Sequence, residues 1–170
     1  MSFSFYSSAA GSGGTEYVMQ NTKQAIFKLG EEEYGLDIMD VNMIEKFIPV
    51  EKVANSPKNV NGMIHLRGNI IPVYSLRRKF GLEEKEADKD TRLIITTSNG
   101  ILVAYEVDKM LEIAQIKPEQ LNEIPSAVQS KDTAYLKSIT NLNGRLVILL
   151  NHDGILSVEE QNNILSIIKK

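Results

Sequence analysis

Few side chains in this sequence are placed for acid–base chemistry. Asp37 and Asp40 are close neighbours, and two carboxylates held together could act as a general acid and a general base. His152 is followed directly by Asp153, a pairing that can orient an imidazole. No motif places a nucleophile beside either pair. A turn is therefore the favoured interpretation of residues 152–153, and we expect Asp37, Asp40 and His152 to lie apart.

Other forms of catalysis are excluded more directly. The chain contains no Cys, which rules out disulfides, thiolate nucleophiles and Cys-based metal sites, and it has only 2 His. No nucleophile elbow, Walker loop or zinc-protease motif is present. Residues 11–14 are rich in Gly, but no strand precedes them, so we interpret residues 1–22 as a flexible tail. The sequence predicts no enzyme, no cofactor and no metal.

Composition narrows the class of partner. The 170 residues carry a formal net charge of −3, and only 6% are aromatic. Such a chain lacks the basic footprint of a nucleic-acid binder. The longest apolar run, residues 146–150, is far shorter than the roughly 20 residues of a membrane-spanning helix. We therefore expect no nucleic acid and no direct membrane insertion.

The elements that would position these residues are predicted to be β-hairpins. Two short apolar runs separated by Gly or Asn-Gly are typical of a hairpin, because these residues accept the positive φ angles of a tight turn. The pattern occurs four times, at residues 24–29 with 33–38, 63–66 with 70–74, 93–97 with 101–107, and 136–140 with 146–150. The fold class is therefore mainly β.

A weak internal repeat divides the hairpins into two pairs. Residues 65–73 align with residues 141–149, and residues 43–45 align with residues 110–112 at a different offset. We interpret this as two β subdomains at about 24–81 and 91–153. Units of about 60 residues bury too little surface to be stable alone, so the two should pack together as one cooperative unit.

The remaining segments are predicted to be a linker and two helices. Residues 83–90 are almost all charged and are expected to form an exposed linker, and residues 77–79 a short helix with a solvated face. Ser157 and Glu160 form a capping box that starts a C-terminal helix over residues 157–168. Its apolar face is predicted to contain Val158 and Ile164, among others.

Several motifs, taken together, resemble a known family. Residues 27–38 are similar to the opening hairpin of the CheW family of bacterial chemotaxis coupling proteins. Residues 61–73, with the sequence NGMIHLRGNIIPV, resemble its central Leu-Arg-Gly motif, and residues 76–82 and 144–150 follow in the expected places. The resemblance extends over about 24–168, so residues 23–168 are expected to form a CheW-like domain.

The resemblance implies a fold and a function. The fold would be two five-stranded SH3-like β-barrels packed together, with short helices and a C-terminal helix. The function would be that of a non-enzymatic adaptor, which couples the cytoplasmic tips of chemoreceptors to the regulatory domain of the histidine kinase CheA. Such a protein would be cytoplasmic and recruited to receptor arrays at the membrane.

The resemblance also implies binding residues. In the family, a receptor helix docks in a groove between the barrels, and the matching positions in this sequence are Val41, Ile44, Gly62, Arg67 and Ile113. An apolar trough formed by Val and Ile suits an amphipathic helix. Core packing remains an equal alternative for Val41 and Ile44, a backbone role for Gly62, and bracing of the turn for Arg67.

Kinase binding is implied for the segment after the early helix. Its residues here are Val50, Glu51, Lys52 and Val53, within an alternating pattern predicted to be an exposed strand. An ordinary amphipathic strand is the alternative interpretation.

The sequence departs from the family at several positions. Met43 stands where a Glu that could pair with Arg67 is common, so Arg67 is left with Glu45, Asp40 or solvent. Residues 122–131 lack the usual Arg and Phe of a second kinase contact. Two alternatives stay open: a divergent CheW-like scaffold of another histidine-kinase pathway, and a small β-barrel enzyme or ligand binder that uses Asp37, Asp40 or His152.

Overall fold

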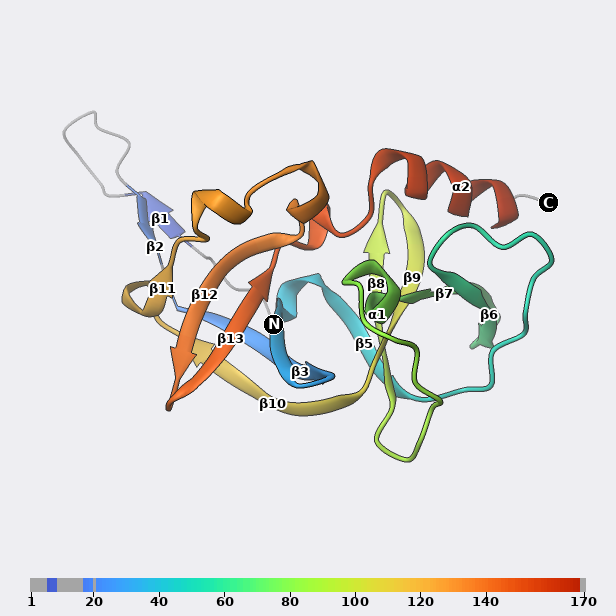
Figure 1. Ribbon diagram of the computed structural model, residues 1–170, viewed down its shortest axis with the longest axis horizontal. Coiled ribbons are helices and arrows are strands. Elements are labelled where there is room, and N and C mark those ends of the chain that lie inside the picture. The colour runs from blue at the N-terminus through green and yellow to red at the C-terminus, as the bar shows by residue number, and fades with distance from the viewer. Residues whose placement is uncertain (1–5, 9–16, 20, 169–170) are drawn as a thin grey trace.

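The computed structural model describes the chain except for residues 1–5, 9–16, 20 and 169–170. The described part is mainly β, with short helices and a C-terminal helix, as the sequence predicts. Two sheets dominate it, one of six strands and one of five. In Figure 1 the six-stranded sheet lies on the left and the five-stranded sheet on the right.

The two sheets share one plan. In spatial order the six-stranded sheet contains β10 (Lys109–Ile116), β3 (Thr22–Leu29), β4 (Glu32–Asp37), β13 (Arg145–Leu150), β12 (Leu136–Leu142) and β11 (Leu121–Asn122). The five-stranded sheet contains β5 (Val41–Lys46), β8 (Arg92–Ser98), β9 (Ile101–Val107), β7 (Asn69–Ser75) and β6 (Val60–Leu66).

The internal repeat corresponds to this shared plan. Each sheet joins two hairpins through a central parallel pair, β4 with β13 and β7 with β9. The aligned segments 65–73 and 141–149 fall on equivalent hairpins, and segments 43–45 and 110–112 fall on the equivalent edge strands β5 and β10. All four predicted hairpins are confirmed by their antiparallel registers.

Both sheets curl so that their two edges approach. After β5 the chain crosses to β6, where Glu51 and Met63 exchange backbone hydrogen bonds of 2.8 Å. After β10 the chain crosses to β12, where Leu121 pairs with Thr140. In each case the continuation of one edge strand pairs with the opposite edge, which closes the sheet in the manner of a barrel.

The sheets do not follow the contiguous ranges 24–81 and 91–153 that we expected. The first hairpin, β3 and β4, belongs to the sheet that also contains β10 to β13, while residues 41–107 supply the whole five-stranded sheet. The parallel pairs cause this arrangement, because they join strands that are distant in sequence and leave no local turn signal. The tail predicted over residues 1–22 also contains paired strands, β1 (Tyr6–Ser8) and β2 (Tyr17–Met19). The rest of residues 1–16 lies outside the described residues.

Buried side chains form three clusters. One fills the inside of the six-stranded sheet, and another fills the inside of the five-stranded sheet. The largest lies between the sheets and takes residues from both, including Phe27 and Leu36 from one and Ile94 and Tyr105 from the other. We call it the inter-sheet cluster. Because both sheets bury side chains in this one cluster, neither sheet can unfold without exposing the core of the other. We therefore expect the two sheets to form one cooperative unit.

Two α-helices and several 3-10 turns complete the fold. Helix α2 (Val158–Ile168) buries Ile164 in the inter-sheet cluster and starts at the predicted capping box, in which the Glu160 amide donates to Ser157 Oγ at 3.0 Å. Val158 does not join the apolar face and is 74% exposed. The short turns are η1 (Ile38–Asp40), η2 (Pro118–Gln120), η3 (Ser126–Val128), η4 (Lys131–Thr133) and η5 (His152–Gly154).

Helix α1 (Leu76–Lys79) carries the basic run, and the solvated face predicted for it is wrong. Its three cations each form an ion pair with a different segment. Arg77 reaches Asp108 between β9 and β10, Arg78 reaches Glu84 of the linker, and Lys79 reaches Glu160 of α2. The helix therefore connects parts of the fold that the backbone leaves separate.

Candidate protein-docking surfaces

Val41 and Ile44 lie on edge strand β5, where they are half-buried. Both pack against the inter-sheet cluster, and Ile44 pairs across the ladder with Ile94 of that cluster. Because β5 has a hydrogen-bonded neighbour on one side only, part of each side chain stays accessible. The structure thus shows core packing for part of each side chain, and the groove interpretation of these two residues stays a prediction.

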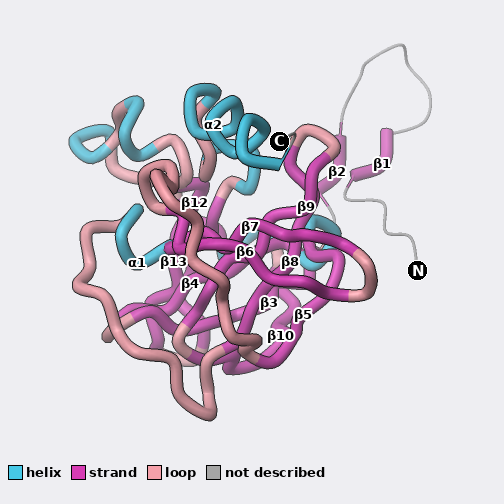
Figure 2. Tube along the Cα trace, turned by 90° about the vertical axis from the view of Figure 1, so that its right-hand side faces the viewer, coloured by secondary structure: helices cyan, strands magenta, loops and turns pink. Residues whose placement is uncertain are grey.

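Ile113 lies on β10, the edge strand of the other sheet, and is 54% exposed. It pairs with Ala25 of β3, which pairs in turn with Leu36 of the inter-sheet cluster. Ile113, Ala25 and Leu36 therefore form a row of cross-strand neighbours. Ile113 is the exposed end of this row, and Leu36 is the end that is buried in the inter-sheet cluster. Figures 1 and 2 both draw β5 and β10 close to β3. We call the accessible apolar side chains of these two edge strands, those of Val41, Ile44 and Ile113, the β5–β10 surface.

Two methionines near this surface were not predicted from the sequence. Met39, in η1 just before β5, is 43% exposed, and Met110 of β10 is half-buried against the inter-sheet cluster. Unbranched, polarisable Met side chains adapt to varied partners. Their position depends on β5 and β10 being strands beside β3, and neither segment carries a hairpin signal.

Arg67 occupies an unfavourable backbone conformation. It has a φ of 51° in the turn between β6 and β7, and the equivalent turns of the other three hairpins have Gly30, Asn99 and Asn143 at this place. A side chain other than Gly, Asn or Asp costs about 1–2 kcal/mol in this region. Backbone strain of this kind is found mainly where a side chain has a function. In Arg67 the functional group would be the guanidinium.

The guanidinium of Arg67 reaches strand β5. Its Nη2 donates to Glu45 Oε1 at 3.0 Å, and its Nη1 lies 3.5 Å from Met43 Sδ. Glu45 therefore takes the place of the acidic partner that Met43 cannot supply. Met43 packs inside the five-stranded sheet, whereas Ile44 packs against the inter-sheet cluster. Arg67 thus contacts the face of β5 opposite to Ile44, and the structure does not place it on the β5–β10 surface.

Gly62 is buried and has a backbone role. A Cβ atom at this position would lie 2.1 Å from the carbonyl oxygen of Glu51, and the φ of 151° disfavours any side chain. The absence of a side chain lets β6 approach Glu51 closely enough for the Glu51–Met63 bridge. Gly62 therefore belongs with the predicted kinase segment, and it does not contribute to the β5–β10 surface.

The predicted kinase segment is not a continuous strand, because only Glu51 pairs with a neighbour. Val50 packs inside the five-stranded sheet and Val53 is half-buried. Glu51 and Lys52 are exposed, and the Glu51 carboxylate lies 3.6 Å from His65. The segment thus offers two charged side chains on a backbone that Val50 and the bridge hold in place.

The acid–base candidates are closer than we expected. Burial raises the pKa of Asp40, an electrostatic interaction with His152 opposes that rise, and the negative charge of Asp37 adds to it. Asp40 therefore lies within electrostatic range of both Asp37 and His152, so the expectation that the residues lie apart does not hold for Asp40. Asp37 accepts a hydrogen bond of 2.9 Å from the Met39 amide, and His152 packs edge-on against Tyr105. These contacts give Asp37 a capping role and His152 a packing role.

The geometry defines a class of protein. Closed sheets share one core, an apolar surface follows two edge strands, and an exposed charged segment lies on a rigid backbone elsewhere. Within the described ranges no group of three or more His, Asp or Glu could hold a metal ion. No helix there is long and apolar enough to cross a membrane. Such an arrangement of surfaces is that of a protein-docking module.

Comparison with known proteins gives the family. Residues 24–160 match the family model of the CheW-like domain. The chemotaxis protein CheW of Klebsiella aerogenes is 34% identical over 135 residues, which is 79% of this chain and 81% of the relative. The CheW of Bacillus subtilis is 26% identical over 149 residues, covering 88% of this chain and 96% of that protein.

A solved structure shows the same fold. The crystal structure of the scaffolding protein TtCheW from Thermoanaerobacter tengcongensis matches with a TM-score of 0.73 and 32% identity, and it covers 82% of this chain and 95% of its own. The chain belongs to the CheW family. It is a non-enzymatic adaptor, or scaffold, of chemotaxis signal transduction.

Proposed function

We propose that this adaptor couples chemoreceptors, the methyl-accepting chemotaxis proteins, to the histidine kinase CheA through two separate surfaces. The observation that supports this most is that Val41, Ile44 and Ile113 leave apolar side-chain surface accessible on the edge strands β5 and β10, whereas Glu51 and Lys52 are exposed in a different segment. Two partners can be held at once only if their sites do not overlap. In the cell the adaptor would be cytoplasmic and recruited to membrane receptor arrays.

The β5–β10 surface is the proposed receptor site. An amphipathic receptor helix would lay its apolar side on Val41, Ile44 and Ile113, with the adaptable Met39 and Met110 beside them. Burial of the 54% exposed Ile113 would add hydrophobic stabilisation to the complex. Gly62 would contribute only through the backbone that it positions.

Arg67 is proposed to act at the margin of the complex. Its strained turn and its hydrogen bond to Glu45 hold the guanidinium over β5. A receptor carboxylate or amide could be bound by the N–H groups that Glu45 leaves free. Arg67→Ala should therefore impair assembly of the ternary complex more than it lowers stability, and unchanged assembly would remove Arg67 from the site.

The segment Val50 to Val53 is the proposed kinase site. Val50 anchors the backbone inside the five-stranded sheet, and Glu51 and Lys52 face solvent where a regulatory domain of CheA could meet them. Reversal of the exposed charge in Glu51→Lys should weaken kinase binding. Glu119→Lys, which reverses an exposed glutamate in η2, is the matched control.

The decisive experiment is reconstitution. The purified chain is mixed with CheA and a receptor signalling fragment, and co-sedimentation and kinase activity are measured. Val41→Arg should abolish receptor co-sedimentation and leave kinase binding intact, because a charge placed in an apolar contact costs about 2–5 kcal/mol when desolvated. Val158→Arg, at a position that is 74% exposed on α2, is the control.

Each outcome has a distinct meaning. Receptor-dependent kinase activation that requires the chain supports the coupling role. Kinase binding without receptor coupling favours the alternative of a divergent scaffold in another histidine-kinase pathway. A sharp fall in the melting temperature of Val41→Arg would show that Val41 is chiefly a core residue and would contradict the receptor assignment.

A further inference from the structure

Two cations face each other across the ladder that joins β5 and β8. Lys46, the last residue of β5, pairs with Arg92, the first residue of β8. Residues directly opposite in an antiparallel ladder have Cβ atoms about 5 Å apart, and like charges at such positions are destabilising. Among the described residues, no carboxylate lies within ion-pair distance of either side chain. We call Lys46 and Arg92 the cationic pair.

The cationic pair lies on the face of β5 that carries the proposed receptor site. Side chains two residues apart along a strand share a face. Ile44 and Ile94, two positions along the same ladder, both pack against the inter-sheet cluster, so Lys46 and Arg92 point to that side as well. Lys46 is exposed and Arg92 is half-buried. The β5 side of the β5–β10 surface therefore ends in two cations.

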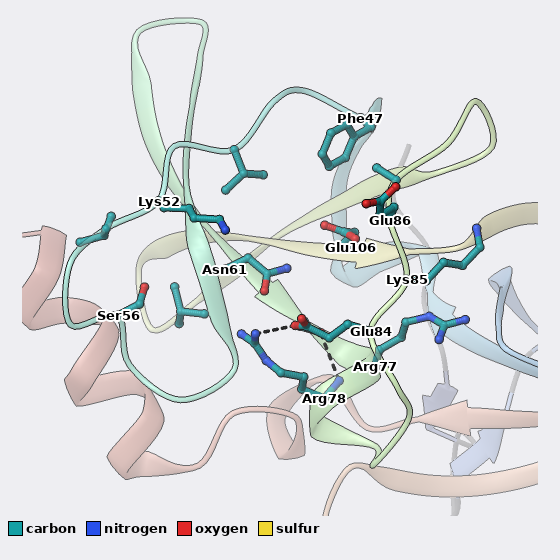
Figure 3. Close-up of a pocket in the computed structure, with 15 residues that line it drawn as sticks. Phe47, Lys52, Ser56, Asn61, Arg77, Arg78, Glu84, Lys85, Glu86 and Glu106 are labelled. Carbon is teal, nitrogen blue, oxygen red and sulfur yellow. Dashed lines mark hydrogen bonds and ion pairs between the residues drawn. The ribbon is translucent and has the colours of Figure 1, made fainter.

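The neighbouring acids of the ladder lie on the opposite face. Glu45 and Glu106 are both cross-strand neighbours of Leu93, which packs inside the five-stranded sheet. Glu45 accepts its hydrogen bond from Arg67 there, and Glu106 lines a cavity on that side together with Phe47, as Figure 3 shows. The sheet therefore separates its charges, with these acids on one face and the cationic pair on the other.

The acids that adjoin Arg92 by another route do not neutralise it either. Asp88 accepts hydrogen bonds from within its own turn, and Asp108, which follows the strand next to Arg92, is held by Arg77. Asp90 lies in the same turn as Asp88, and in the described part of the chain it forms no ion pair with Arg92. The charge on this face is thus left for an acid from outside the chain.

The guanidinium of Arg92 is held in place without being neutralised. Its Nη1 donates to the backbone carbonyls of Lys89 at 3.0 Å and Thr91 at 2.9 Å. These bonds orient the group and use one of its three nitrogens. The other two, Nε and Nη2, can bind a carboxylate through two parallel bonds.

The register of β5 sets the spacing that a partner needs. A bulge places Val41, Ile44 and Lys46 opposite every second residue of β8. Two residues of a strand span about 6.7 Å, and four residues of an α-helix rise about 6 Å. A helix that follows β5 therefore meets these three positions with residues i, i+4 and i+8, of which the first two must be apolar and the third acidic.

We propose that the cationic pair binds an acidic side chain of the receptor helix, one turn beyond the apolar residues that contact Val41 and Ile44. This inference rests on the proposed function, because the helix must follow β5. The receptor carboxylate accepts hydrogen bonds from both cations and relieves the repulsion between them. The contact also fixes the direction of the helix, since the reverse direction places an apolar residue on the cations.

Lys46→Glu tests the proposal, because its expected effects on stability and on binding have opposite signs. The new carboxylate faces Arg92 across the ladder, which is a favourable pair, so the melting temperature should equal or exceed that of the wild-type chain. Co-sedimentation with the receptor signalling fragment should weaken about tenfold or more, because Arg92 is then occupied and the receptor acid is repelled. Binding to CheA alone should not change.

The matched control is Lys117→Glu, which makes the same change of charge at an exposed lysine before η2. If Lys46→Glu melts below the wild-type chain, Arg92→Gln takes its place as the test variant, with the same expected loss of receptor binding.

A second measurement identifies the receptor acid. Each acidic residue of the receptor fragment is replaced by Gln, and binding is measured with the wild-type chain and with Lys46→Glu. One replacement should weaken binding of the wild-type chain about tenfold and leave binding of Lys46→Glu unaffected, since two residues in contact are not additive.

Two results would overturn this proposal alone. One is receptor binding by Lys46→Glu as tight as that of the wild-type chain. The other is an equal loss in Lys46→Glu and Lys117→Glu, which would reduce the effect to net charge. A wild-type chain that does not co-sediment with the receptor fragment would instead contradict the proposed function itself.

Discussion

The structure uses arginine–carboxylate pairs in two regions, and it uses them in opposite ways. Beside α1, Arg77 and Asp108 are mostly buried, with side chains 17% and 16% exposed, and lie 2.6 Å apart. At the tips of the hairpins, Arg67 pairs with Glu45 and Arg145 pairs with Glu112, and the side chain of Arg67 is 66% exposed. The same chemistry is therefore placed in two different environments.

The partners show what each region does. Asp108 lies between β9 of the five-stranded sheet and β10 of the six-stranded sheet. It also accepts a hydrogen bond from the Gly30 amide in the β3–β4 turn. Burial alone would raise the pKa of Asp108, but the hydrogen bonds from Arg77 and Gly30 hold it below its usual value. This pair fixes one sheet against the other.

Each tip pair connects strands of a single sheet, and Arg145 also lies 3.6 Å from Glu33 of β4 in the same sheet. Arg67 and Glu45 are on the hairpin and the edge strand of the five-stranded sheet, and Arg145 and Glu112 are at similar places in the six-stranded sheet. Solvent competes with such exposed pairs, so they add little stability. The difference teaches that the α1 region is built for rigidity, whereas the tips keep charged groups available to partners.

The largest expected effect tests the rigid region. Arg77→Ala leaves the Asp108 carboxylate mostly buried without its cation, and removal of one partner of a buried pair costs about 3–5 kcal/mol. The free energy of unfolding, measured with urea, should fall near the lower end of this range because the pair retains some exposure. A loss as small as that of an exposed arginine would break the contrast between the two regions.

A smaller effect with a defined pH dependence is expected at α2. Glu160 accepts hydrogen bonds from Tyr74 Oη and Lys79 Nζ, and although burial acts in the opposite direction, these bonds lower its pKa from the ordinary 4.5. Its contribution is therefore complete above pH 4.5 and is lost as the pH falls through the lowered value. Glu160→Gln should lose about 1.5–3 kcal/mol at pH 7.

The measurement for Glu160→Gln is the melting temperature as a function of pH. The gap between the wild-type chain and the variant should narrow below pH 4.5, where the wild-type carboxylate also becomes protonated. The control is Glu159→Gln, on the exposed face of the same helix turn. Its melting temperature should equal that of the wild-type chain at every pH. A gap that stays constant down to acidic pH would mean that the network acts through packing and not through charge.

The smallest effect on stability is expected at the tips. Arg67→Ala should change the free energy of unfolding by less than about 1 kcal/mol, because an exposed ion pair contributes little. Ala disfavours a positive φ as Arg does, so this substitution leaves the backbone strain of the turn unchanged. Arg67→Asn should stabilise slightly, since Asn tolerates a positive φ at this turn position. A marked loss in either variant would show that the tip pair is structural.

Local patterns in the sequence predicted the parts of the fold that depend on neighbouring residues. The four hairpins follow from turn residues such as Asn99-Gly100, and the start of α2 follows from the Ser157–Glu160 box. The motifs at residues 27–38, 61–73, 76–82 and 144–150, taken together, indicated the family. These signals are readable because a turn or a cap is stabilised within a few residues.

Only the tertiary structure decided how the strands are shared and which site residues meet. The parallel pairs β4 with β13 and β7 with β9 join distant segments, so no local signal shows that β3 belongs with β10. Pairing between distant segments likewise places Ile113 beside Ala25 on β3, directs Arg67 to Glu45 of β5, and buries Gly62 against Glu51. Strand alternation and long-range pairing fix the face that each side chain takes, and both exist only once the sheets have formed.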